Sequence, residues 1–110
     1  FKTFRPLKAG QATVQALKNG QVDAANIFST DPSIAANDFV VLEDTEKLYG
    51  SQNIVPLVRT EVQDKVAPVL DAVSAKLTTE VVADLLKQTD IDKKDPKAVA
   101  EAFVQDNGLA

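Results

Sequence analysis

A short apolar segment ends in four side chains suited to binding a small ligand: Phe28, Ser29, Thr30 and Asp31. The segment, residues 22–28, is too short for a typical helix and follows a helix stop, so we expect a buried strand. One flat ring and several hydrogen-bonding groups would then lie at a sheet edge, where open α/β folds bind ligands. The same pattern fits a core phenylalanine followed by a capping turn, and the usual burial of Phe favours that second interpretation from composition alone.

The sequence offers little for catalysis or metal binding. It contains no His and no Cys, which excludes Ser-His and Cys-His nucleophilic arrangements and most zinc sites. The glycines are too scattered for a phosphate loop. Carboxylates pair at Glu43-Asp44 and at Asp90 and Asp92, and we expect both pairs to be solvated loop ends. We therefore predict no catalytic residue, no metal ligand and no cofactor.

Length and charge narrow the choice of partners. A chain of 110 residues predicts one domain with a modest core. It carries 12 Lys and Arg against 16 Asp and Glu, a net charge of −4 without a run of like charges, so we expect no nucleic-acid partner. No apolar stretch approaches the ~18 residues of a membrane span. The chain begins with Phe rather than Met, which suggests a piece of a longer precursor.

The first half of the chain has the composition of strands. Continuous apolar runs predict buried strands at residues 22–28, 39–42 and 54–59. Pro56 cannot donate to a ladder, which restricts the third strand to a sheet edge or a bulge. We therefore expect strands in the first half and mainly helices after Thr60, an α/β class of fold.

Helix starts and stops are marked by specific residues. Gln11–Lys18 should form a helix that ends at Gly20, a residue tolerant of the left-handed conformation. Residues 60–63 match a capping box, in which a threonine and a glutamine satisfy each other's exposed amides. Thr78 should cap the next helix, and Asp95, followed by a proline, should open the last one.

Residues 17–31 carry a longer and more specific pattern. They read LKNGQVDAANIFSTD, which resembles L-K-N-G-x-(V/I)-D-(V/A)-x-x-x-(Y/F)-(S/T)-T-D of the substrate-binding proteins of osmoprotectant ABC importers. That family binds glycine betaine, choline, carnitine or proline betaine. Further matches follow in the family's order at residues 40–44, at residues 52–59 and at the terminal helix opened by Asp95. The resemblance covers nearly all of this chain but only the C-terminal portion of a family member.

The resemblance implies a fragment of a type II periplasmic-binding fold, in which two α/β lobes close over a solute. Within 1–110, residues 1–37 would belong to one lobe and residues 38–110 to the other. The implied function is that of a non-enzymatic solute-binding component, which captures a quaternary ammonium compound for an ABC transporter permease. The implied location is extracytoplasmic, either periplasmic or lipid-anchored at the outer face of the cytoplasmic membrane.

The resemblance also implies which residues bind the solute. Phe28 falls where the family carries a cage tyrosine, and its ring keeps the π-face that attracts a methylated cation. Residues 29–31 would form the adjacent polar wall. Gln52, before Asn53, stands where a second cage tyrosine is usual. An amide in place of a ring implies a weaker cage or a solute more polar than glycine betaine.

Two other expectations accompany this interpretation. The same fold also serves as the effector-binding domain of transcription regulators, an alternative that would require an upstream helix-turn-helix. Incomplete sheets would leave unpaired edges, which favour self-association of the chain into a homo-oligomer.

Overall fold

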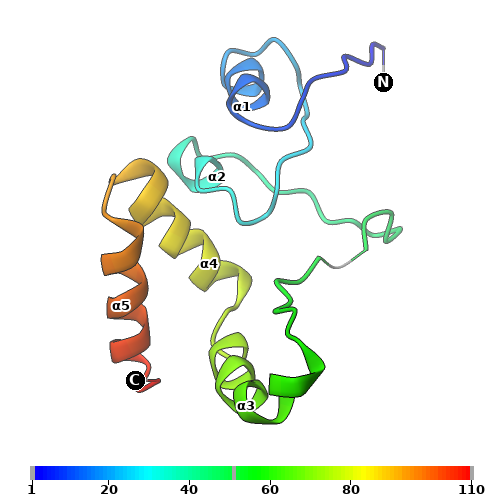
Figure 1. The fold of residues 1–110 in the computed structure, drawn as a ribbon. Coiled ribbons are helices and arrows are strands. Elements are labelled where there is room, and N and C mark those ends of the chain that lie inside the picture. Colours follow the sequence, from blue (N-terminus) through cyan, green and yellow to red (C-terminus); the bar gives the residue numbers. More distant parts are fainter. Residues whose placement is uncertain (1, 51, 110) are drawn as a thin grey trace.

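The computed structural model describes residues 2–50 and 52–109, which form helices joined by long irregular segments (Figure 1). The α-helices are α1 Gln11–Lys18, α2 Ser33–Ala36, α3 Gln63–Ser74, α4 Thr79–Leu86 and α5 Pro96–Asp106. A 3-10 turn, η1 Thr60–Val62, precedes α3, and a π-helical turn, η2 Lys87–Ile91, follows α4. Figure 1 shows α4 and α5 diverging below the turn between them, with α3 near the start of α4.

The α/β class predicted from the sequence is wrong, because residues 2–50 and 52–109 contain no strand. A strand makes its hydrogen bonds to a neighbouring strand, so β-type composition alone cannot form one. The three predicted strands pair with no other strand among the described residues and are irregular, at residues 22–28, 39–42 and 54–59. Val22, Ile27 and Phe39 are half-buried, whereas the apolar side chains of residues 40–42 and 54–58 are exposed, as at Leu57, which is 94% exposed. The strands of a type II periplasmic-binding fold are therefore not formed here.

The chain buries little of its surface. Its radius of gyration is 17.4 Å, whereas a compact domain of this length has a value of about 13 Å. Its accessible surface is 9331 Å², against about 5,900 Å² for a folded monomer of this mass. In the part that the structure describes, the buried hydrophobic side chains are Val14, Ala16 and Val99. Most of the structure is consequently held by local hydrogen bonds.

The end of α1 illustrates such local control. Gly20 takes a φ of 65°, a left-handed conformation that favours glycine. Its amide donates to the Leu17 carbonyl at 3.0 Å, and the Gln21 amide donates to the Ala16 carbonyl at 2.8 Å. This pair of bonds is a Schellman ending, so the predicted bounds of α1 and its Gly20 stop are confirmed.

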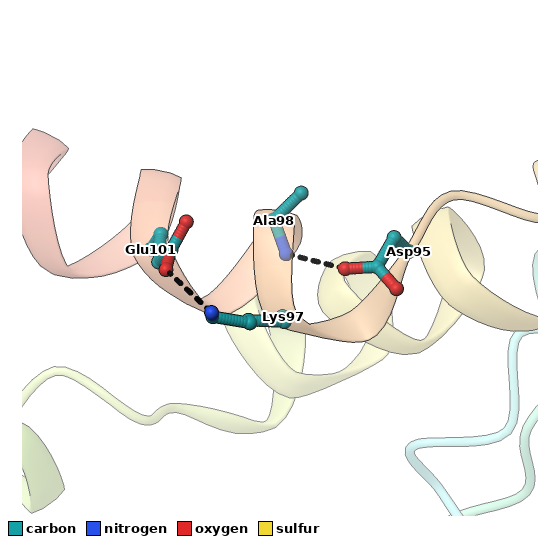
Figure 2. Close-up of polar contacts among 4 residues, drawn as sticks. All are labelled: Asp95, Lys97, Ala98 and Glu101. Carbon is teal, nitrogen blue, oxygen red and sulfur yellow. Dashed lines mark hydrogen bonds and ion pairs between the residues drawn. The ribbon is translucent and has the colours of Figure 1, made fainter.

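Side-chain caps begin α4 and α5 as predicted. The Thr78 hydroxyl accepts from the Val81 amide at 3.3 Å, and the Asp95 carboxylate accepts from the Ala98 amide at 3.0 Å (Figure 2). One turn further on, Lys97 and Glu101 approach to 3.8 Å. That ion pair is largely exposed and contributes only a few tenths of a kcal/mol.

The capping box predicted at residues 60–63 is wrong. Thr60 opens the 3-10 turn η1, and no side-chain bond caps η1 or α3. Gln63 is already the first residue of α3, which starts after Val62. Because the tighter 3-10 turn occupies residues 60–62, Val62 and not Thr60 stands at the N-cap of α3.

We predict that Asp95→Ala destabilises α5 by about 1 kcal/mol, because the Ala98 amide loses its acceptor. Asp95→Asn keeps an oxygen at that position and should cost much less. Helicity by far-UV circular dichroism, together with amide exchange at Ala98, measures both effects. Equal losses for the two variants would contradict the capping role.

Candidate functional site

A compact turn displays Phe28 and leads into α2. The Asp31 amide donates to the Phe28 carbonyl at 2.9 Å, and the Ile34 amide donates to the Asp31 carbonyl at 3.2 Å. The Asp31 carboxylate accepts from the Ser33 amide at 2.9 Å. An aspartate that bonds the amide two residues on makes an Asx turn, which fixes the local backbone. Residues 28–31 therefore have a defined geometry without support from a sheet.

The ring of Phe28 lies outside any core. It is 63% exposed, although phenylalanine is usually buried. Ser29 beside it is exposed, and Thr30 and Asp31 are half-buried. The turn thus offers one apolar face together with two hydroxyl groups and one carboxylate, a combination able to contact a small amphipathic cation.

Ser33, just after the turn, has a buried hydroxyl. The residue is 8% exposed, and its Oγ atom has no hydrogen-bond partner among the described residues. A buried polar atom left without a partner costs about 1–3 kcal/mol. The side-chain amide of the neighbouring Asn37 donates to the Ser33 carbonyl, at 2.8 Å, and not to this hydroxyl. The start of α2 therefore carries unused hydrogen-bonding capacity.

The other two predicted ligand residues are Gln52 and Asn53. Gln52 and Asn53 are exposed and lie at the start of the irregular segment that leads to α3. In residues 2–50 and 52–109, no side-chain hydrogen bond joins either amide to Phe28 or its neighbours. The grouping of all six predicted residues in one site stays a prediction.

A second fixed turn was missed from the sequence. Both oxygens of Asp44 accept backbone hydrogen bonds, from the Leu48 amide at 3.0 Å and the Tyr49 amide at 2.8 Å. The Lys47 amide donates to the Asp44 carbonyl at 3.1 Å. The hydrogen bonds from the Tyr49 and Leu48 amides to the carboxylate lower the pKa of the Asp44 carboxyl, and the bond from Tyr49 has the larger effect. The available signal was an aspartate followed by polar turn-forming residues.

A groove lies elsewhere, between α3, α4, η2 and α5. It measures about 620 Å³ and is mostly apolar, and its lining includes Phe103, Lys93 and Lys94. None of the six predicted ligand residues lines it. The residues that match the family's ligand-binding pattern lie outside this groove, so we locate the candidate site at the exposed turn of residues 28–31.

Across residues 2–50 and 52–109, no group of three metal-ligating side chains comes together. In the same residues, every helix is too short or too polar to cross a bilayer.

Comparison with known families gives a direct match. Residues 1–106 match OpuAC, the substrate binding domain of ABC-type glycine betaine transport system. The chain belongs to this family. The match spans both turns and all the helices, so the resemblance drawn from residues 17–31 is confirmed.

Two curated relatives of this OpuAC-family chain are transport proteins. It is 30% identical over 110 residues to the carnitine transport binding protein OpuCC of Listeria monocytogenes, an alignment that covers 97% of this chain and 35% of that protein. It is 28% identical over 98 residues to the ergothioneine transport permease/ergothioneine binding protein EgtU of Helicobacter pylori, covering 86% and 18%. The chain therefore spans about a third or less of these relatives' lengths. No solved structure matches it significantly.

We predict that the Asp44 turn loosens in acid. A lowered pKa in the folded chain means that the turn is stabilised above the ordinary value of 3.8 and loses that stabilisation as pH falls through the lowered pKa. The amide signals of Leu48 and Tyr49 in an NMR titration should shift with a midpoint below 3.8. Asp44→Asn should abolish this transition, and a midpoint at or above the ordinary value would contradict the bonding described.

Proposed function

We propose that this chain is part of the solute-binding component of an ABC importer for a zwitterionic quaternary ammonium compound. The description of the family names glycine betaine as the transported solute, and the names of the two relatives contain carnitine and ergothioneine. Each of these three compounds carries a trimethylammonium group and a carboxylate. A receptor for this class needs a face for the cation and hydrogen-bond donors for the anion.

The exposed ring of Phe28 carries this proposal. A trimethylammonium group has no N–H and cannot donate a conventional hydrogen bond, so it is bound through the faces of aromatic rings. Phe28 lies within the family match, and its backbone is fixed by the bond to the Asp31 amide. The Asp31 carboxylate adds a negative charge on the same turn, which favours a cation nearby.

The carboxylate of the solute requires donors from other residues. Asp31 would repel it, whereas the hydroxyl groups of Ser29 and Thr30 can donate one hydrogen bond each. The amides of Gln52 and Asn53 can donate two each, and both residues are exposed. Amides at these positions favour a solute with more polar groups than glycine betaine, such as a hydroxyl beside the carboxylate.

The proposed activity is capture and delivery, without chemical conversion of the solute. The protein would deliver the solute to the permease of the same importer. It would function on the outer side of the cytoplasmic membrane, either in a periplasm or attached to the membrane by a lipid anchor. Transport proteins among the relatives support this arrangement. They give no support to the alternative of a regulator's effector-binding domain.

The test is calorimetric titration of the protein at its natural length with glycine betaine, carnitine and choline. Phe28→Ala should weaken binding about 3- to 30-fold, the usual worth of one cation–π contact, and Phe28→Tyr should retain it.

Phe4→Ala serves as the matched control, because this ring is 87% exposed and lies outside the predicted site. It should leave the affinity unchanged. If Phe28→Ala binds glycine betaine or carnitine as tightly as the unaltered protein does, the ring has no part in the site. If neither of these two zwitterions binds, the proposed solute class is wrong, whether or not choline binds.

A further inference from the structure

Two asparagines of this chain precede a glycine at the end of a helix. Asn19 and Gly20 close α1, Asn107 and Gly108 close α5, and all four residues are exposed. Asparagine is among the thermally labile residues. Glycine has no Cβ to shield its amide nitrogen, so that nitrogen can approach the carbonyl carbon of the preceding asparagine side chain. Each pair is therefore a place where the side-chain amide can be lost without an enzyme.

The two helix ends have the same backbone geometry. Gly20 and Gly108 take φ values of 65° and 64°. The amide of each glycine donates at 3.0 Å to a helix carbonyl, that of Leu17 in α1 and that of Gln105 in α5. A bonded amide is not free to react, so the helix end must open before the reaction can begin. The rate at each asparagine consequently depends on how readily its helix end frays.

The end of α5 is held more firmly than the end of α1. The side-chain amide of Asn107 donates to the Phe103 carbonyl at 2.9 Å, whereas the Asn19 side chain makes no hydrogen bond to another described residue. The residue after the glycine is half-buried Leu109 in α5 and exposed Gln21 in α1. An apolar side chain at that position packs on the last helical turn and stabilises a Schellman ending. We therefore expect α1 to fray more readily.

The neighbouring charges favour reaction at the same helix end. Lys18 precedes Asn19, whereas Asp106 precedes Asn107. The reaction begins when the glycine amide loses its proton. A cation nearby stabilises the resulting anion, and a carboxylate nearby destabilises it. Fraying and charge thus both single out Asn19.

We propose that Asn19 is a site of spontaneous deamidation, a covalent modification that adds a negative charge and opens the end of α1. The deprotonated Gly20 nitrogen attacks Cγ of Asn19. The new carbon–nitrogen bond closes a succinimide ring, and the side-chain nitrogen leaves as ammonia. Water then opens the ring at either carbonyl carbon, and the products are aspartate and isoaspartate.

The isoaspartate product disrupts the helix end. It lengthens the main chain by a methylene group between residue 19 and Gly20, so the amides of Gly20 and Gln21 lose their alignment with the carbonyls of Leu17 and Ala16. Ala16 is one of the few buried hydrophobic side chains among the described residues. The modification therefore weakens a helix that contributes to the small core.

The experiment is peptide mapping by mass spectrometry, on the protein at its natural length after storage in mildly alkaline buffer. Residue 19 should convert about 3- to 30-fold faster than residue 107, the combined effect of one hydrogen bond and opposite neighbouring charges. Asn19→Gln is the matched control, because glutamine keeps the amide but would have to close a larger ring. It should show no conversion at this position over the same period.

The denatured protein provides the reference, because unfolding removes the difference in fraying and leaves only the difference in charge. The ratio of the two rates should be larger in the folded protein than in the denatured protein. Equal rates at residues 19 and 107 in the folded protein would overturn the inference. A folded protein in which Asn19 stays unchanged, over a period in which the denatured protein converts it, would overturn it as well.

Discussion

A methylated cation can be bound firmly only by surfaces that do not need a hydrogen bond from it, and aromatic faces are the protein groups of that kind. Such a face must be accessible before the solute arrives. Keeping a phenyl ring in water forgoes about 2 kcal/mol of burial free energy, so its backbone must be held by other means. At Phe28 those means are the bond from the Asp31 amide to the Phe28 carbonyl and the bond from the Ser33 amide to the Asp31 carboxylate. The proposed function depends on this arrangement.

The helices could be predicted from the sequence because their signals act over a few residues. Gly20 ends α1, and Thr78 and Asp95 begin α4 and α5, each through bonds to atoms two to four residues away. The strands could not be predicted in the same way. Residues 39–42 and 54–59 have the right composition, but a ladder requires a second segment at a matching register, and composition does not specify that partner.

The candidate site shows the same contrast between local signals, which the sequence reveals, and long-range packing, which it does not. Residues 28–31 were predicted as a turn as well as a ligand-binding segment, and their bonds confirm the turn. The exposure of Phe28 runs against the burial that its residue type favours. The Asp44 turn was missed because Asp44 was predicted to be a solvated loop end, whereas in the structure both of its carboxylate oxygens accept hydrogen bonds from backbone amides. A position of Gln52 and Asn53 beside this turn would depend on long-range packing, which local patterns do not encode.

The most direct measurement is an intermolecular nuclear Overhauser experiment on the protein at its natural length, with labelled phenylalanine rings and carnitine as the solute. We expect cross-peaks between the N-methyl protons of carnitine and the ring protons of Phe28, together with an upfield shift of the N-methyl signal. Bound carnitine whose N-methyl protons contact only other residues, and not Phe28, would show that this ring does not bind the cation.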